Sequence, residues 1–82
     1  MKTVNKDIEV IAYFSANKEP IPLKFKLDDK SVAVNKIISK EKQKRAGEDM
    51  FVFECQSEIN GEIKRYVLKY VVSKCKWYLF KI

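Results

Sequence analysis

The stretch "MFVFECQSEINGEIKRYVLKYVVS", residues 50–73, decides the fold class. Asn60-Gly61 separates two runs that are rich in β-branched and aromatic residues, and these residue types favour strands. An Asn-Gly pair favours a two-residue type I′ turn, because both central positions of that turn need a positive φ. The stretch therefore predicts an antiparallel hairpin with strands over residues 50–57 and 62–73.

Alternation along these two strands predicts which side chains are buried. Successive strand side chains point to opposite sides of a sheet, so every second residue shares a face. On each strand one face is the more apolar. We expect these faces to lie inside, with Phe51, Phe53 and Cys55 on the first strand and Tyr66, Leu68 and Tyr70 on the second.

Two of the strands predicted outside this hairpin lie toward the ends of the chain. Residues 7–15 are rich in β-branched and aromatic types, and we expect Pro20 and Pro22 to stop that ladder from continuing. Residues 77–82, "WYLFKI", form the last strand, with Trp77 and Leu79 as its inward side chains.

Residues 22–28 show the clearest period of two in the chain. Leu23, Phe25 and Leu27 are expected on a dry face, and the lysines between them on a wet face. Asp28-Asp29 follows, and we interpret this pair as a turn rather than a metal site, because turns favour aspartate.

Residues 31–46 fit two interpretations. Ser31 as an N-cap and Gly47 as a terminator would suit a helix, whereas the valines and isoleucines of the first half favour a strand. We prefer the strand. The polar run "SKEKQKRAGED", residues 39–49, then predicts a mobile basic hairpin tip.

Together these elements predict a single all-β domain over residues 1–82, with about six antiparallel strands in a strongly bent meander or small partly closed barrel. Closure would remove the exposed edges that a meander leaves. We expect the first strand to pair with the last.

Two segments of the chain together carry a recognisable pattern, "EPIPLKFKLDDKSVAVNKIISKEKQKRAGEDMFVFECQ", residues 19–56, and "NGEIKRYVLKYVVSKCKWYL", residues 60–79. They contain a Pro followed by an aromatic-basic strand, a Val-rich strand, a Gly-ended insertion, a Phe-x-Cys-like strand and a terminal Trp-Tyr-Leu. In these features the chain resembles a group of small bacterial all-β domains that have no known function. The resemblance implies a small all-β fold and a bacterial origin.

The composition argues against several kinds of chemistry. The chain has no histidine, which is the commonest general base and zinc ligand, and its two glycines cannot form a phosphate-binding loop. We expect Cys55 to be an inert core thiol and Cys75, between two lysines, to be exposed and the more reactive. We predict a non-enzymatic protein that needs no metal or other cofactor.

The cellular location is predicted from the same composition. No apolar run reaches the roughly 20 residues of a membrane span. Asp7 and Glu9 interrupt the apolar part of the N-terminus, which argues against a signal peptide. Two unpaired cysteines also suit a reducing compartment. We expect a cytoplasmic protein that does not enter the membrane.

Charge and aromatic residues concentrate at the C-terminal end. The net charge is +6, and residues 62–82 hold six basic residues, one acidic residue and five of the ten aromatic residues. Basic and aromatic side chains together are typical of nucleic-acid-binding β-folds. The candidate nucleic-acid-binding residues are Lys24, Lys26, Lys64, Arg65, Lys69, Lys76 and Tyr78.

An alternative function belongs to another class. Apolar side chains on the outer face of the last two strands would form an interface, either with another protein or with a second copy in a homodimer. The candidate interface residues are Val67, Val71, Tyr78 and Phe80, and Ile82 belongs to the same predicted face. The simplest interpretation is a solvated lysine face over a packed hairpin. The sequence leaves these interpretations open.

Overall fold

The computed structural model describes residues 1–82 and confirms an all-β, antiparallel fold. It has no α-helix, and its one short 3₁₀ turn, η1 (Val72–Lys74), precedes the last strand. The strands are β1 (Thr3–Ile8), β2 (Val10–Phe14), β3 (Pro20–Leu27), β4 (Lys30–Ala33), β5 (Lys36–Arg45), β6 (Glu48–Ile59), β7 (Glu62–Val71) and β8 (Lys76–Lys81).

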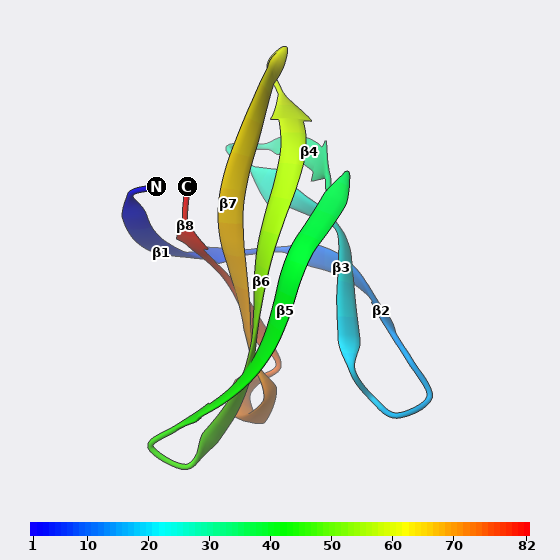
Figure 1. Cartoon of the computed structure of the whole chain (residues 1–82), viewed down its shortest axis with the longest axis vertical. Helices are drawn as coiled ribbons and strands as arrows, with labels where there is room; N and C mark the ends of the chain where they lie inside the picture. Colours follow the sequence, from blue (N-terminus) through cyan, green and yellow to red (C-terminus); the bar gives the residue numbers. More distant parts are fainter.

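The strands form two sheets, which Figure 1 shows as two layers that splay apart at one end. The larger sheet has the order β1-β8-β7-β6-β5 and the smaller one has the order β2-β3-β4. The predicted pairing of the first strand with the last is confirmed only for its beginning: β1, which includes Asp7 and Ile8, pairs with β8, whereas most of the predicted strand 7–15 is β2 in the smaller sheet. Backbone hydrogen bonds between Lys2 and Ile82 also hold the two chain ends side by side.

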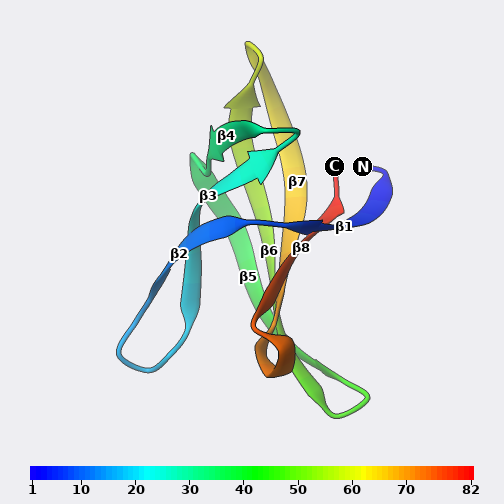
Figure 2. The ribbon, with the colours of Figure 1, turned by 180° about the vertical axis from the view of Figure 1, so that it is seen from behind.

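Two extended runs of chain pass from one sheet to the other, as the view from behind shows (Figure 2). Residues 3–14 leave the larger sheet at Glu9, so that β1 belongs to one sheet and β2 to the other. Residues 30–45 change sheets between β4 and β5 in the same way. The strand interpretation of residues 31–46 is therefore confirmed, with a corner at Val34 and Asn35.

The sheets do not close into a barrel. A side-chain ion pair connects the middle of β5 to the residue before β3, with 2.6 Å between the Lys40 amine and a Glu19 carboxylate oxygen, but no ladder joins these strands. Pro20 and Pro22 have no N–H to donate to such a ladder. The predicted break after residues 7–15 is present, but the expectation that Pro20 and Pro22 would block a ladder is wrong. They pair with Phe14 and Ala12, where β3 has no β4 neighbour, and prolines are tolerated in such edge segments.

The core lies between the two sheets and matches the predicted inward faces of the central hairpin. Phe53, Cys55, Tyr66 and Leu68 are completely buried. Trp77 and Leu79 are buried as predicted. The smaller sheet contributes only Phe25 and Val32 to a cluster that otherwise comes from β6, β7 and β8, namely Phe51, Phe53, Cys55, Tyr66, Leu68, Tyr70, Trp77 and Leu79.

A buried serine fastens the sheets together at the corner between β4 and β5. The Ser57 hydroxyl donates to the Ala33 carbonyl oxygen at 2.6 Å and accepts hydrogen bonds from the Tyr66 hydroxyl and the Asn35 N–H. The Asn35 side chain in turn accepts from the Glu58 N–H at 2.8 Å. Because each polar group has a partner, this network can be buried without the cost of an unsatisfied hydrogen-bonding group.

Two bulges change which way predicted side chains point. The register between β2 and β3 shifts between Ile11 and Ala12, so Leu23 turns outward instead of joining Phe25 on the dry face. A second shift lies between Val67 and Leu68 of β7, opposite Phe80. This shift moves Ile82 from the predicted outer face to the core. A bulge inserts one residue and thereby reverses the alternation beyond it.

Three hairpins turn through pairs of residues that both have positive φ. The pairs are Asp28–Asp29, Ala46–Gly47 and Asn60–Gly61. The predicted turns at the first and third pairs are confirmed. The second turn is tighter than expected, because residues 39–45 of the predicted tip lie in β5 and are paired with β6. Phe51 helps to hold this strand, since the Lys42 amine lies 5.7 Å from the centre of its ring.

Candidate binding surfaces

The outer face of β7 and β8 carries the centre of the predicted basic and aromatic surface. Lys69 and Tyr78 are cross-strand partners here. The Lys69 amine lies 4.0 Å from the centre of the Phe80 ring, and the Lys81 amine lies 5.3 Å from it. Burial lowers the pKa of Lys69, and the charge of Arg45 lowers it further. The protein's own lysines therefore cover the Phe80 ring that a partner would use.

Two other predicted cations have acidic neighbours. Arg65 lies 3.7 Å from a Glu54 carboxylate oxygen, and the Lys76 amine lies 3.4 Å from one of Asp7. Such exposed pairs contribute only about 0–1 kcal/mol to stability. They also reduce the local positive charge that would attract a phosphate.

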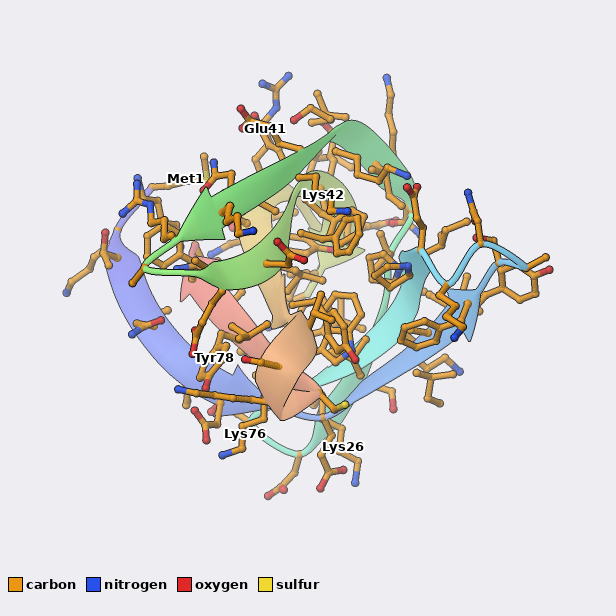
Figure 3. All side chains as sticks on the ribbon, turned by 90° about the horizontal axis from the view of Figure 1, so that it is seen from below. Met1, Lys26, Glu41, Lys42, Lys76 and Tyr78 are labelled. Atoms are coloured by element: carbon orange, nitrogen blue, oxygen red, sulfur yellow. The ribbon has the colours of Figure 1, made fainter.

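The remaining predicted basic residues are dispersed. Lys24 and Lys26 lie on β3 in the smaller sheet, and Lys64 lies near the Asn60–Gly61 turn. Lys26 lies on β3 in the smaller sheet, whereas Tyr78 and Lys76 lie on β8 in the larger sheet; all three are labelled in Figure 3. The structure thus brings Lys69 and Tyr78 together but does not gather all seven candidate residues on one surface.

The predicted interface on the outer face of the last two strands is mostly covered. Val67 and Val71 are only 9% and 6% exposed, although they point to the side opposite the main core. Tyr78 and Phe80 are partly exposed. Neighbouring strands on both sides of β7, together with the lysines over Phe80, leave little apolar surface there.

The two cysteines lie where they were predicted. Cys55 is buried, and burial raises the pKa of its thiol to about 12. Cys75 is exposed in the turn before β8, where its thiol lies 3.7 Å from the Val72 carbonyl oxygen. No three cysteine, aspartate or glutamate side chains lie close enough together to hold a metal ion.

The largest exposed apolar surface was not predicted, and it lies on β2 and β3. Five of the ten large apolar side chains that are exposed belong to these two strands. Four of them, Ile11, Tyr13, Ile21 and Leu23, lie on the outer face of the smaller sheet and are 62%, 58%, 37% and 48% exposed. We call these four residues the hairpin patch. The sequence signal for it was present, because both faces of the predicted first strand carry apolar side chains.

The fifth exposed residue, Phe14, lies on the other side of β2. It is 46% exposed, and its ring meets the ring of Tyr70 edge to face at 5.7 Å between centres. The β2 strand is also the last strand of its sheet, so it forms a ladder on one side only. Figures 1 and 2 show the β2–β3 hairpin projecting away from the larger sheet.

Comparison with known proteins gives no match: no family model, curated protein or solved structure is similar to this chain. No helix in the structure has the length and apolar character needed to cross a membrane. Two surfaces therefore remain as candidates for function, the outer face of β7 and β8 and the hairpin patch with its strand edge.

Proposed function

We propose that the chain is a protein-interaction module that binds an extended segment of a partner along the free edge of β2. The observation that carries this proposal is the combination of an unpaired strand edge with the exposed hairpin patch. An extended segment at a sheet edge gains backbone hydrogen bonds, and alternate side chains supply the specificity. Exposed apolar surface of this kind is typical of interaction sites.

The charge distribution of β2 supports this mode of binding. Residues 10–14, "VIAYF", contain no charged side chain, although the whole chain has 17 basic and 11 acidic residues. Strand edges that remain unpaired in proteins usually carry charges, prolines or bulges that prevent pairing. Strand β2 has no charge or proline, and the extra residue of the register shift between β2 and β3, Leu23, lies on β3 rather than on β2.

The experiment uses a capped peptide with the sequence of residues 9–15, "EVIAYFS", as an extended apolar probe. We expect it to shift the backbone amide NMR signals of Val10, Ala12 and Phe14 at millimolar concentration. A peptide in which proline replaces the central alanine lacks the middle N–H and should bind at least about tenfold more weakly. Absence of shifts in β2, or equal binding of both peptides, would contradict the proposal.

A matched pair of variants tests whether the hairpin patch contributes. Ile11 and Ile63 are similarly exposed, at 62% and 67%, and both lie in strands. Ile11→Lys should weaken peptide binding at least about tenfold, because it places a charge in the apolar contact. Ile63→Lys, which is outside the patch, should leave binding unchanged.

We propose electrostatic binding of nucleic acid as a second candidate function. It is favoured by the number of cations that have no acidic partner, since only Lys6, Lys40, Arg65 and Lys76 of the 17 basic residues form ion pairs. Among the other thirteen, Lys69 lies beside Tyr78, a ring on which a base could stack.

Fluorescence anisotropy with a labelled oligothymidine tests this second candidate. Binding should be present at low salt and should weaken with a slope of about −0.7 in log affinity against log salt for each phosphate contacted. Lys69→Gln should reduce that slope, whereas Lys36→Gln at the start of β5 should not. Salt-independent binding, or no binding at low salt, would rule it out.

A further inference from the structure

We infer that the partner at the β2 edge is a second copy of this chain, which pairs its own β2 antiparallel to the first with Ala12 on the two-fold axis. The inference rests on the proposed strand-addition function and names the partner. The result would be one six-stranded sheet made of two copies of β2-β3-β4.

Backbone geometry identifies the groups available at this edge. Glu9 accepts a hydrogen bond from the Lys26 N–H, and the Ser15 N–H donates to the Glu19 carbonyl, so both residues direct their backbone groups toward β3 or the loop before it. Backbone groups of successive residues point to opposite sides of a strand. Val10, Ala12 and Phe14 therefore direct their N–H and C=O groups away from β3.

These three residues form a self-complementary edge. With Ala12 opposite Ala12 of the second copy, Val10 lies opposite Phe14 of that copy, and each of these pairs can exchange two N–H···O=C bonds. On the outer face, Ile11 lies opposite Tyr13 of the second copy. Pairs of an aromatic and a β-branched residue contribute about 0.2–1 kcal/mol each. A strand centred on its smallest residue also avoids a steric conflict at the axis.

Each copy carries +6, but this charge opposes the arrangement only weakly at physiological salt. Strand β2 has no charged residue. Among the β3 residues that pair with β2, only Lys24 carries a charge. In the dimer the two β3 strands would be three strand spacings apart, or about 14 Å. This distance exceeds the Debye length of about 8 Å at physiological salt, so the repulsion between the lysines is largely screened.

Pairing of the two β2 edges would cover surface of the β2 side chains Ile11, Tyr13 and Phe14, which are 62%, 58% and 46% exposed. Ile21 and Leu23 lie on β3, away from the seam, and would stay exposed. The buried area is therefore smaller than about 800 Å² per partner, the size of a standard interface, and small interfaces of this kind are typical of weak association. We accordingly expect a weak dimer.

The space beside the edge is open. A hollow of about 340 Å³ lies between the start of β2 and the start of β8, and its lining includes Glu9, Val10, Cys75 and Trp77. At this point the β1–β8 ladder ends at the pair Ile8–Trp77, and η1 precedes β8 in the chain. Nothing in the same chain continues the sheet next to β2.

Sedimentation of the intact chain is the first experiment. We expect a dimer with a dissociation constant on the order of 10–100 µM. The affinity should increase several-fold when salt is raised from 0.05 to 0.5 M, because salt screens the repulsion between two +6 chains. Ile11→Lys changes both Ile11–Tyr13 contacts and should weaken the dimer by about tenfold, whereas Ile63→Lys should leave it unchanged. Equal dissociation constants for wild type and Ile11→Lys, or a dimer that only Ile63→Lys weakens, would overturn the inference.

Disulfide cross-linking tests the register in a Cys75→Ser background. The Cα atoms of the two Ala12 residues would be about 5.5 Å apart, which a disulfide can span. The two Tyr13 residues would be about 8 Å apart, which exceeds the roughly 7 Å limit. Ala12→Cys should therefore cross-link on mild oxidation and Tyr13→Cys should not. The reverse result would contradict the proposed axis.

The two proposals can fail separately. In one outcome the chain stays monomeric at about 0.5 mM and does not cross-link, yet it binds the residue 9–15 peptide along β2. This outcome would overturn the second-copy inference and leave the strand-addition function intact. A monomer whose β2 signals do not respond to the peptide would overturn both.

Discussion

The β6–β7 and β2–β3 hairpins consist of similar apolar residues, but only the first is covered. Strands β5 and β8 flank β6–β7 along most of its length, and side chains on both of its faces, such as Phe53 and Val67, are buried. In contrast, β4 flanks β3 only from Lys24 to Leu27. The difference indicates that neighbouring strands decide which apolar residues are buried, and composition does not.

The free edges of the two sheets also differ in how well they are protected against pairing with another strand. Strand β5, at the edge of the larger sheet, has five basic residues and one acidic residue in ten, and a register shift near Ile38. Seen from below, Glu41 points outward and Lys42 lies over the interior (Figure 3). Charges and bulges are common means of preventing edge pairing. Strand β2 has no charge, which is why we assign the partner to β2.

The largest expected effect comes from truncating one phenylalanine in each hairpin. Phe53→Ala should lower the free energy of unfolding by about 3–5 kcal/mol, because it leaves a cavity in the core. A domain of this size has only about 5 kcal/mol in total, so the variant should be largely unfolded. Phe14→Ala should cost less than about 1 kcal/mol. Urea unfolding followed by Trp77 fluorescence measures both, and similar losses would remove the contrast between the hairpins.

An intermediate effect is expected from alkaline pH, which acts on the buried hairpin. Burial raises the pKa of Cys55 from 9.0 and that of Tyr66 from 10.0, each to about 12. Both groups therefore ionise more readily in the unfolded chain, and stability is lost as the pH rises above these unfolded values. The slope should be about 1.4 kcal/mol per pH unit for each group.

The control for this prediction is Cys55→Ala. Between about pH 9 and 10, Cys55 titrates in the unfolded chain and Tyr66 does not yet do so. The variant should therefore lack the loss of stability in this pH interval. Unfolding free energies at pH 7, 9, 10 and 11 test it. Equal pH dependence of wild type and variant in that interval would show that Cys55 is not the responsible group.

The smallest effect concerns the turns of the two hairpins. Asn60 has a φ of 53°, and asparagine tolerates this left-handed conformation better than alanine. Asn60→Ala should therefore cost about 0.5–1 kcal/mol. Asn17, in the loop between β2 and β3, is not among the residues with positive φ, and Asn17→Ala should cost less than about 0.5 kcal/mol. Thermal unfolding distinguishes them, and equal losses would contradict the role of φ.

Local patterns predicted much of the fold. The Asn60–Gly61 turn and the alternation in β6 and β7 led to the correct hairpin and core, because both depend on residues that are close in sequence. The predictions failed where the register shifted. The bulges beside Leu23 and Phe80 depend on the pairing of distant strands, and no local pattern signals them.

The candidate surface was harder to predict, for a related reason. The basic C-terminal segment stood out in the sequence, yet the structure covers Phe80 with lysines and pairs Arg65 and Lys76 with acidic residues. The hairpin patch includes Ile11 and Tyr13, which in the sequence look like ordinary strand residues. Their exposure depends on where β4 and β8 end.

The sequence by itself determined the all-β class, the tight turns and the faces on which side chains are grouped, because these follow from φ preferences and a period of two. Only the tertiary structure decided that the chain forms two sheets rather than a closed ring, and that Ser57 joins them at the Asn35 corner. It also decided that the β2 edge remains free. Alternation specifies which side chains share a face, but burial depends on which strands cover that face, and such contacts join residues far apart in the chain.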